Sequence, residues 1–410
     1  MRKTRILFYF THKESLGHTT RVLNIINYIK NKYSKKVDIY VFQAGKPQRY
    51  LPIPKGVFWF NLPYPYYSKL NFKKGSTRTY FPFYAKLRAN YMLSKIKDIE
   101  PDIFITEFFP FGREDCRFEL MPVLTCLKRK KIKIYASIGY PYIVRGNIPV
   151  LLYHCEFYDK IFIHTPKDIE FNYLAKDIQN PLLKQMYNKT FRRIGDKVIY
   201  TGYIGPVNLT KPDNYDREKV RSDYNAQNKI LVLVSRGGGV RYPKIIASSI
   251  LAKQYLPDNF VFIITAGPAS SKKEMLLFRD LIKKTKSKQV YLYKYLPDFL
   301  SYLKASDISI NMAGYNTSVP LLYLKKHSII IPSNEDPETA VGYCSEQISR
   351  AKILKKYIGG RILDYHTFTA GDIAENIKNM DLDKIAGFSK NIKDDWFNGA
   401  EITAKNIVYG

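Results

Sequence analysis

Short apolar runs alternate along this chain with longer stretches in which apolar residues recur every three or four positions. A short run bounded by polar or glycine residues predicts a buried strand, and the longer spacing predicts an amphipathic helix. Regular strand–helix alternation is typical of parallel sheets joined by right-handed crossovers. The predicted strands span residues 5–10, 37–43, 57–61, 102–106, 132–137, 160–164, 197–201, 230–234, 260–265, 289–292, 307–311 and 328–331.

The predicted helices fall between these strands, and the alternation is interrupted once. Residues 208–228 are polar, include proline and hold few large aliphatic side chains, so they predict a linker. We therefore expect an α/β protein with an N-terminal domain at 1–207 and a C-terminal domain at 229–385. A final segment, 386–410, is expected to form a helix that packs back on one domain. The other helices are predicted at residues 19–33, 80–98, 115–130, 243–255, 273–285, 297–304, 317–325, 344–352 and 370–379.

Three predicted strands end in turns of small residues that lead toward a helix. The turns are Gly17-His18, residues 235–240 with three consecutive glycines, and residues 311–317. Backbone N–H groups at the start of a helix and the positive end of its dipole form an anion site. In the last turn, Gly314 permits close approach of a phosphate, and Asn316 or Thr317 is expected to cap the helix. None of the turns has the glycine spacing of dinucleotide-binding or P-loop sites.

The composition is that of a globular protein of about two domains, with 410 residues of which 45% are apolar. A net charge of +30 indicates attraction to nucleic acid, phosphorylated substrates or an anionic membrane face. The basic residues are scattered and no nucleic-acid-binding motif is present, which disfavours the first of these. The sequence shows no apolar run of the roughly 18 residues that a spanning helix needs, no secretory signal and no zinc-like cysteine spacing. These features favour a cytoplasmic protein with reduced thiols.

Aromatic, basic and proline residues are interleaved between Phe58 and Met92. Such a segment suits docking on lipid headgroups, where aromatic rings and lysines are both stable. It equally suits a loop that lines an acceptor site, or a packed core with solvated lysines. The sequence leaves these three interpretations open.

Segments in both halves of the chain resemble those of one enzyme family. The residues that carry the resemblance are 16–21, 109–113 with 117–120, 313–317, and 346–347 with 350–351. They resemble, in chain order, a Gly-His loop, a P-F-G-R…R-F-E-L segment, a G-G-Y-N-T donor loop and an E-Q…R-A helix. The family is the GT-B-fold glycosyltransferases, and in particular those related to the enzyme that adds N-acetylglucosamine to the lipid-linked peptidoglycan precursor. The resemblance implies two Rossmann-like domains, each a doubly wound parallel sheet, facing a cleft.

The reaction that the resemblance implies is sugar transfer with inversion. Such transfer needs a base for the acceptor hydroxyl and a stabiliser for the departing diphosphate. His18 is the leading candidate for the base because imidazole titrates near working pH, His12 is its rival, and Glu114 would assist. The residues implied to bind the donor are Arg236, Gly237, Gly238, Gly267, Tyr295, Leu296, Gly314, Tyr315, Asn316, Thr317, Glu346 and Gln347. Those implied on the acceptor side are Gly17, His12, Arg113 and Tyr140.

Within the donor set, the start of the helix after residue 314 is expected to hold the diphosphate, with Arg236 as an added cation. Tyr295 and Leu296 would lie beside the nucleotide base, and Glu346 or Gln347 would bind sugar or ribose hydroxyls. No metal and no cofactor are implied, because this class uses helix ends and basic residues at the diphosphate.

Two departures from the family pattern bear on the donor. Pro320 stands where relatives often carry a glutamate, and Ala313 replaces a glycine. We expect a hexose or N-acetylhexosamine to move from a UDP-sugar to a hydroxyl acceptor, lipid-linked or polysaccharide. We expect a cytoplasmic location with peripheral contact to the inner face of the membrane, and no nucleic-acid partner. A nucleotide-sugar 2-epimerase, a non-catalytic sugar-nucleotide-binding protein, which Pro320 favours, and a nucleic-acid-binding protein remain alternatives.

Overall fold

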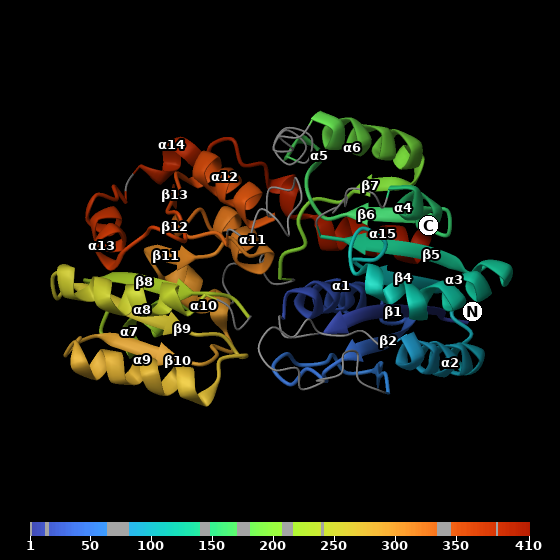
Figure 1. Cartoon of the computed structure of the whole chain (residues 1–410), viewed down its shortest axis with the longest axis horizontal. Helices are drawn as coiled ribbons and strands as arrows, with labels where there is room; N and C mark the ends of the chain where they lie inside the picture. Colours follow the sequence, from blue (N-terminus) through green and yellow to red (C-terminus); the bar gives the residue numbers. More distant parts are fainter. Residues whose placement is uncertain are drawn as a thin grey trace. The chain divides into compact units, whose positions relative to one another are not determined.

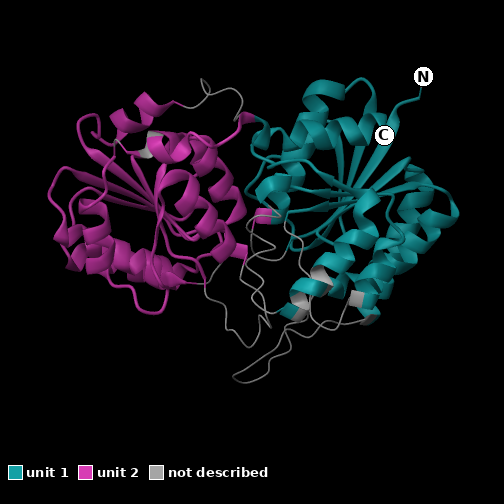
Figure 2. Cartoon of the chain, turned by 90° about the horizontal axis from the view of Figure 1, so that it is seen from above, with its two compact units in different colours: residues 1–13, 18–207, 395–410 teal, residues 14–17, 208–394 magenta. Residues whose placement is uncertain are grey.

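The computed structural model describes residues 2–12, 16–63, 82–139, 148–169, 181–206, 216–238, 242–333, 346–382 and 384–410. The chain forms two compact units (Figure 2). The N-terminal unit comprises residues 1–13, 18–207 and 395–410, and the C-terminal unit comprises residues 14–17 and 208–394. Figure 1 labels the helices and strands that build them.

The N-terminal unit is built on a seven-stranded sheet in which every strand pairing is parallel. Its strand order, β3-β2-β1-β4-β5-β6-β7, is that of a doubly wound fold. The strands are β1 (Thr4–His12), β2 (Val37–Gly45), β3 (Val57–Asn61), β4 (Ile103–Glu107), β5 (Lys133–Ile138), β6 (Lys160–Ile163) and β7 (Val198–Tyr200). The helices are α1 (Gly17–Tyr33), α2 (Pro82–Ile99), η1 (Glu114–Cys116), α3 (Arg117–Arg129), α4 (Ile148–Cys155), α5 (Lys167–Ile169), α6 (Pro181–Ile194), η3 (Gly195–Lys197) and α15 (Gly399–Tyr409).

Helices α1 and α15 share one hydrophobic core with the central strand of this sheet. Strand β1 is buried on both faces, so it is a continuous apolar run instead of an alternating one. The apolar positions of α1 recur at helical spacing and therefore lie on one buried face. The helix residues in this core are Val22, Ile25, Ile26 and Ile29 of α1 and Ala400, Ala404 and Ile407 of α15.

A buried ion pair ties α2 and α3 to β1. Arg88 on α2 and Glu119 on α3 are both 0% exposed and are paired, and the hydroxyl of Tyr9 on β1 donates to the same carboxylate. A buried charge is costly unless it is paired, so removal of one partner destabilises more than replacement of both. These contacts fix the start of α3 beside the loop that follows β4.

The chain returns to the N-terminal unit through a close backbone crossing. The N–H of Tyr203 donates to the carbonyl of Trp396 at 2.6 Å, and the N–H of Gly399 donates to the carbonyl of Tyr203 at 3.2 Å. A Cβ on Gly399 would lie 2.4 Å from the backbone oxygen of Gly202, so only glycine fits at this position. The crossing anchors the start of α15.

The C-terminal unit repeats the same sheet order with one strand fewer. Its six strands pair in parallel in the order β10-β9-β8-β11-β12-β13. The strands are β8 (Ile230–Ser235), β9 (Phe260–Thr265), β10 (Val290–Tyr293), β11 (Ile308–Asn311), β12 (His327–Ile330) and β13 (Arg361–Ile362). The helices are α7 (Arg217–Asp223), α8 (Pro243–Ala252), η5 (Lys253–Tyr255), α9 (Lys272–Lys284), α10 (Phe299–Ala305), α11 (Tyr315–Tyr323), α12 (Glu346–Ile358), α13 (Ala370–Lys378) and α14 (Ile385–Ser389), with η6 (Asp394–Phe397) at the passage back to the N-terminal unit.

The core of the C-terminal unit lies between its sheet and three helices. Strands β8, β9 and β11 are buried, and α8, α9 and α13 each contribute apolar side chains at helical spacing. The helix residues in this core are Ile245, Ile246, Ile250, Met275, Phe278, Ile373, Ala374 and Ile377.

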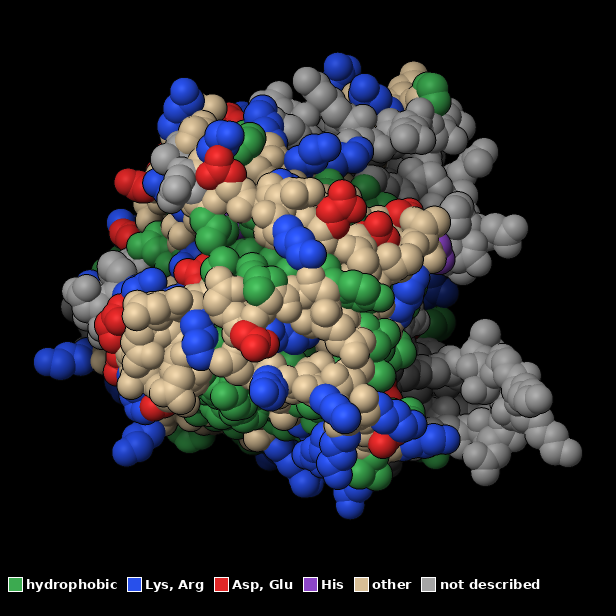
Figure 3. All heavy atoms as spheres, turned by 90° about the vertical axis from the view of Figure 1, so that its left-hand side faces the viewer, with side chains coloured by type: hydrophobic (Ala, Val, Ile, Leu, Met, Phe, Trp, Pro, Cys, Tyr) green, Lys and Arg blue, Asp and Glu red, His purple; other side chains and the backbone are tan. Residues whose placement is uncertain are grey.

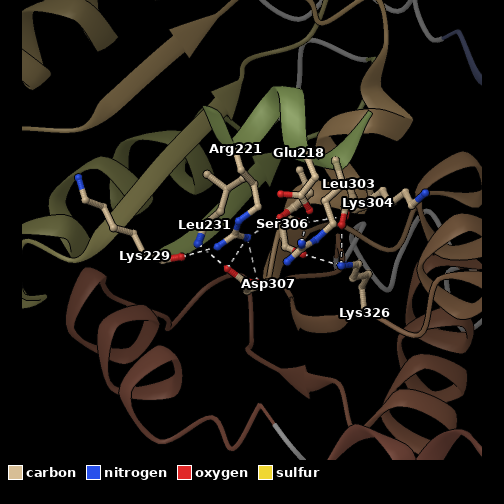
Figure 4. Close-up of polar contacts among 11 residues, drawn as sticks. Glu218, Arg221, Lys229, Leu231, Leu303, Lys304, Ser306, Asp307 and Lys326 are labelled. Carbon is tan, nitrogen blue, oxygen red and sulfur yellow. Dashed lines mark hydrogen bonds and ion pairs between the residues drawn. The ribbon is translucent and has the colours of Figure 1, made fainter. Parts of the chain in front are cut away.

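Part of the predicted linker folds as α7, and a polar cluster fastens this helix to the C-terminal unit (Figure 4). Arg221 is buried, pairs with Asp307 at 3.1 Å and donates to the carbonyl of Lys229 at 2.6 Å. Lys326 donates to two backbone carbonyls of the same cluster, each at 2.7 Å. Residues 217–223 of the predicted linker thus form a helix that polar residues fasten to the C-terminal unit, and the linker boundaries stay a prediction. Residues 208–215 lie outside the described residues.

Every predicted strand is present, and the sequence pattern missed the two-residue strand β13 and the helices α4 and α6. Helix α11 begins at Tyr315, directly after a glycine, and not at residue 317 as predicted. The aromatic and basic segment contributes β3 and α2, and its central residues, 64–81, lie outside the described residues.

Of the helices in the described ranges, none is both long enough and apolar enough to cross a bilayer. Lys and Arg side chains are scattered over the face of the C-terminal unit that Figure 3 shows, with Asp and Glu side chains between them. A nucleic-acid backbone requires a continuous basic stripe or patch. The face in Figure 3 shows no continuous basic stripe of the kind that binds a nucleic-acid backbone.

We expect Gly399→Ala to destabilise the N-terminal unit by about 1–3 kcal/mol, because the added methyl group meets backbone oxygens at the crossing. Both tryptophans of the chain, Trp59 and Trp396, belong to this unit, so urea unfolding followed by tryptophan fluorescence reports on it alone. Gly195→Ala is the matched control, since a Cβ there meets nothing within 4 Å. Equal unfolding midpoints for the two variants would contradict the importance of the crossing.

Candidate functional site

In each unit the first strand along the chain lies inside the sheet and not at its edge. Strand β1 lies between β2 and β4, and β8 lies between β9 and β11. In a doubly wound sheet, the chain leaves two neighbouring central strands, such as β1 and β4, toward opposite faces. This place is called the switch point, and the carboxyl ends of the two strands border a crevice there. Ligands of open α/β sheets bind at this switch point, so the residues after these four strands are the first candidates for function.

Two side chains meet at the switch point of the N-terminal unit. His18, the second residue of α1, places Nδ1 2.7 Å from Oε2 of Glu107, the last residue of β4. Its other ring nitrogen, Nε2, lies 2.9 Å from Nη2 of Arg113. A guanidinium only donates, so Nε2 accepts and Nδ1 carries the proton that is donated to Glu107. His18 is therefore a neutral imidazole with a defined tautomer.

The surroundings of the pair keep His18 neutral and Glu107 ionised. Burial lowers the pKa of His18 below its usual 6.5, and the Glu107 carboxylate offsets part of this effect. For Glu107 burial acts to raise the pKa, but His18, Arg21 and Arg113 outweigh it and lower the pKa to about 2. At neutral pH the pair is thus an unprotonated base beside a permanent negative charge.

Arg21 forms an ion pair with the Glu107 carboxylate. Its Nη2 lies 2.9 Å from Oε1 of Glu107, and both side chains are buried. Gly139, directly after β5, makes room for this contact, because a Cβ there would lie 1.5 Å from Nη1 of Arg21. Since His18 and Arg21 are three residues apart on α1, they share one face of the helix and reach the same carboxylate.

The P-F-G-R segment shapes the wall beside His18. The ring of Phe108 lies edge-on to the His18 imidazole, with centroids 5.1 Å apart. A Cβ on Gly112 would lie 2.1 Å from that ring, so glycine lets the loop fold over it. Phe108 and Arg113 both have left-handed backbones, with φ of 72° and 57°. Non-glycine residues rarely adopt this conformation, and they cluster where a functional geometry requires it.

Four other residues of this region were predicted to belong to the site, and their places in the structure are as follows. His12 ends β1 and is buried, with Nδ1 3.0 Å from Oγ1 of Thr19. Glu114 begins η1, and the carboxylate bonded to His18 is that of Glu107, so an assisting role of Glu114 stays a prediction. Gly17 is the first residue of α1, and Tyr140 lies outside the described residues.

A tight loop leads from β11 into α11 at the switch point of the C-terminal unit. The side-chain oxygen of Asn311 accepts from the N–H of Ala313 at 2.9 Å and supports the left-handed backbone of Ala313, φ 54°. Gly314 is the N-cap residue, and its carbonyl accepts from the N–H of Thr317 at 2.9 Å. Among the described residues no side chain caps this helix, so the expected capping by Asn316 or Thr317 is wrong. Both residues lie inside the first turn.

The glycine N-cap leaves the start of α11 open. A Cβ on Gly314 would meet nothing within 4 Å. The first N–H groups of a helix lack intrahelical partners, and together with the dipole they attract anions. Tyr315, Asn316 and Thr317 form the first turn, as the predicted donor loop requires. Pro320 lies inside α11, so the glutamate that relatives often carry there has no counterpart at this position.

Helix α12 fixes the shape of this loop. Arg350 is buried, its Nε donates to the carbonyl of Ala313 at 2.7 Å, and its Nη2 pairs with Glu346 at 3.0 Å. Oε1 of Gln347 accepts from the N–H of Ser333 at 2.9 Å. The E-Q…R-A segment therefore acts on the loop through Arg350. The roles of Glu346 and Gln347 toward sugar or ribose hydroxyls stay predictions.

Arg236, which was predicted to add a cation at the diphosphate, serves the loop between β9 and α9. Its side chain is 0% exposed and pairs with Glu274 at 3.0 Å. Its Nε donates to the carbonyl of Ala266 at 2.6 Å, and its Nη2 donates to Oγ of Ser270 at 2.8 Å. All three guanidinium nitrogens thus have partners in the unit, and a contact of Arg236 with the diphosphate stays a prediction.

The remaining predicted donor residues lie after three neighbouring strands. Gly237 follows β8 and Gly267 follows β9, with φ of 77° and 95°, a conformation that glycine adopts without strain. Gly238 follows Gly237 in the same loop, directly before residues 239–241, which lie outside the described residues. Tyr295 is half-buried and Leu296 is buried in the loop after β10. Their contacts with a donor stay predictions.

The sequence analysis gave no role to Glu107, Arg21 or Arg350. A charged residue that ends an apolar strand is the signal for Glu107, because a buried charge requires a partner. For the two arginines the signal is a charged side chain on the buried face of a helix. Each signal says that a partner exists, but not which residue it is.

A family model described as the glycosyltransferase family 28 C-terminal domain matches residues 244–402. An uncharacterized glycosyltransferase of Methanosarcina mazei is 21% identical over 278 residues, which cover 67% of this chain and 64% of that protein. The UDP-N-acetylglucosamine–N-acetylmuramyl-(pentapeptide) pyrophosphoryl-undecaprenol N-acetylglucosamine transferase of Caldicellulosiruptor saccharolyticus is 26% identical over 216 residues, which cover 51% of this chain and 55% of that protein. The chain thus spans less than two thirds of the length of these curated relatives.

Solved structures share the fold over nearly the whole chain. The MurG structure of Acinetobacter baumannii has a TM-score of 0.55 at 10% identity, covering 98% of this chain and 99% of that chain. The UDP-GlcNAc 2-epimerase of Neisseria meningitidis, bound to UDP-GlcNAc, has a TM-score of 0.60 at 12% identity, covering 99% and 100%. The predicted fold class and the predicted relationship are confirmed. The chain has the GT-B fold, its C-terminal half matches the glycosyltransferase family 28 C-terminal domain, and its curated relatives are glycosyltransferases, among them the Caldicellulosiruptor transferase.

Proposed function

We propose that this chain transfers a sugar from a UDP-sugar to an acceptor hydroxyl, with inversion at the anomeric carbon. The observation that carries the proposal is the His18–Glu107 pair, a neutral imidazole whose Nδ1–H is held by an ionised carboxylate. An imidazole held in this way presents Nε2 as its basic nitrogen in a fixed direction. The match to the family 28 C-terminal domain supports the same class of reaction.

In the proposed step, Nε2 of His18 takes the proton of the acceptor hydroxyl as the hydroxyl oxygen bonds to the anomeric carbon. The bond from that carbon to the β-phosphate oxygen breaks, and its electron pair leaves with UDP. Attack opposite the leaving group inverts the configuration. Glu107 stabilises the imidazolium that forms and does not take its proton.

We assign the diphosphate of the donor to the start of α11. The open N-cap at Gly314 and the positive end of the helix support this assignment. Arg350 holds the carbonyl of Ala313, so the loop is ordered before the donor arrives. Backbone N–H groups that are already in place stabilise the charge that develops on the departing diphosphate, because the loop does not have to reorganise during the reaction. The sugar we propose is a hexose or N-acetylhexosamine.

We propose a lipid-linked acceptor and peripheral contact with the anionic inner face of the membrane. The name of the Caldicellulosiruptor relative specifies an acceptor joined through pyrophosphate to undecaprenol. A net charge of +30 favours approach to an anionic lipid surface. Both points support the same kind of substrate.

One alternative is favoured by a specific observation, the likeness in fold to a UDP-GlcNAc 2-epimerase. An epimerase changes the sugar of the donor without any acceptor. NMR analysis of a UDP-sugar incubated with the protein alone separates the two functions, because an epimerised UDP-sugar forms only with an epimerase. Tight binding without turnover of donor or acceptor would identify the non-catalytic alternative.

We expect Gly314→Asp to weaken UDP binding while the C-terminal unit stays at least as stable. Gly314 has φ −63° and ψ 146°, which aspartate adopts readily, and its carboxylate would cap the first turn of α11. The same carboxylate would occupy the anion site and repel the diphosphate. Isothermal calorimetry with UDP measures the affinity, which we expect to fall at least tenfold, roughly 1.4 kcal/mol.

Gly387→Ala is the matched control for this experiment, because a Cβ there also meets nothing within 4 Å and Gly387 lies in the same unit on α14. It should bind UDP as the wild type does. A Gly314→Asp variant with unchanged affinity would refute the assignment of the diphosphate to α11.

We expect kcat/KM to be constant down to about pH 6.5 and to fall only at more acidic pH, because burial lowers the pKa of His18. The sign follows from the base, which is active when unprotonated and is lost as pH falls through its own pKa. In Glu107→Gln the carboxylate that raises this pKa is removed, so the acidic limb should move to lower pH. The plateau should fall by about 10²–10⁴-fold, because the tautomer is no longer fixed.

Initial rates of UDP release across this pH range test the prediction, with His18→Gln expected to lose the acidic limb together with the activity. Glu156→Gln is a suitable control, since Glu156 is an exposed carboxylate of the same unit. A profile of Glu107→Gln that matches the wild type in height and position would exclude Glu107 as the partner of the base.

A further inference from the structure

Arg113 covers the nitrogen that the proposed base uses. Its Nη2 donates to Nε2 of His18 at 2.9 Å. Nε2 of a neutral imidazole with this tautomer has a single lone pair in the ring plane, so it cannot bond Arg113 and accept a hydroxyl proton together. Arg113 must therefore leave Nε2 before the base can act.

The guanidinium of Arg113 is poorly satisfied where it lies. Its contact is with a neutral ring, and its Nε is buried with no hydrogen-bond partner among the described residues. Neither carboxylate that follows it on η1, Glu114 or Asp115, is bonded to Arg113 within the described part of the chain. A buried donor without an acceptor requires an explanation in a native structure.

The charges that meet at this point leave an excess of positive charge. Two arginines, Arg21 and Arg113, act on one carboxylate, Glu107, which forms an ion pair with Arg21 and a hydrogen bond with His18. The histidines at the neighbouring strand ends stay neutral, because burial lowers the pKa of His12, His18 and His164. Within the described ranges Arg113 forms no ion pair with a carboxylate, and Glu107, whose pKa it helps to lower, is in contact with Arg21 and His18 instead.

We propose that Arg113 is a specificity-determining residue that binds an acidic group of the acceptor, a phosphate or a carboxylate, and thereby uncovers Nε2 of His18. This inference rests on the proposed function, since it names the acceptor class for the same site. A planar guanidinium offers paired N–H donors that match the oxygens of either acidic group. An acceptor with such a group near its hydroxyl activates the base, and a neutral acceptor leaves it covered.

The same arrangement protects the donor from water. Water carries no acidic group, so it does not draw Arg113 away from His18, and the base stays covered in the absence of acceptor. Specificity of this kind couples recognition of the correct substrate to assembly of the active site. Moving an acidic group of the acceptor out of water costs free energy, and pairing with Arg113, which is already at the site, offsets this cost.

NMR of the six histidines in ¹⁵N-histidine-labelled protein tests the inference without any need for turnover. His18→Gln assigns the His18 signals, and Gly314→Asp serves as the background so that added anions cannot act through α11. The probes are inorganic pyrophosphate and glucuronate, which distinguish phosphate from carboxylate recognition. We expect at least one of them to change the Nε2 signal of His18 and to raise its pKa, because it withdraws the guanidinium.

Arg113→Met removes both the donor and the charge, and Arg113→Lys restores the charge. We expect Arg113→Met to start with a raised His18 pKa and to ignore both probes, and Arg113→Lys to recover the response to anions. An equal response in Arg113→Met and wild type, or no response in the wild type, would overturn the proposal. A purely structural role for Arg113 predicts loss of the His18 signals and not a shifted titration.

A second measurement uses the UDP-sugar that stabilises the wild type most. We expect its hydrolysis without acceptor to rise several-fold in Arg113→Met, because the uncovered base can then activate water. Unchanged or slower hydrolysis would count against the proposal. If no UDP-sugar binds at all, the proposed function fails, while the NMR experiment still decides whether Arg113 exchanges His18 for an anion.

Discussion

The position of the first strand inside each sheet is the constraint on which the rest of the structure depends. Because β1 lies between β2 and β4, the chain brings together His18 and Glu107, which are 89 positions apart. The equivalent placement of β8 brings the glycine loop after β8 and the loop before α11 to one edge of the second sheet. The strand order thus places two strand ends side by side in each unit, and the residues that follow these strands determine which groups meet there.

Buried arginines give these strand ends their fixed geometry. Arg21 holds a carboxylate, Arg350 holds a backbone carbonyl, and Arg236 holds the loop after β9. Each pairs with an acid within its own unit, so these cations contribute order and not attraction for a distant anion. Arg113 is different, since among the described residues its guanidinium bonds to the neutral imidazole of His18 and forms no ion pair. The high net charge and the chemistry of the site are therefore separate properties of this chain.

Local features of the sequence were enough to predict the strands, while His18 and the start of α11 were singled out with the help of a family resemblance and their roles stay predictions. Continuous apolar runs identify strands of a parallel sheet because both faces are covered. Partners distant in sequence could not be predicted in this way. From the sequence alone Arg236 resembles a surface cation, because nothing indicates that Glu274 is its partner. The residues of α7 resemble a linker in the same way, because Arg221 pairs with Asp307, which is 86 residues away. Spacing along the chain carries no information about such pairs.

The return of the chain at Gly399 has a consequence for the order in which the protein can be made. Ala400, Ala404 and Ile407 complete the core around β1, yet they are synthesised after the whole C-terminal unit. Domains generally fold as units during synthesis, the first one earliest. Here the first unit emerges from the ribosome with part of its apolar surface uncovered and waits for α15. The second unit can close its own core sooner, so the N-terminal unit, which holds His18, is completed after it.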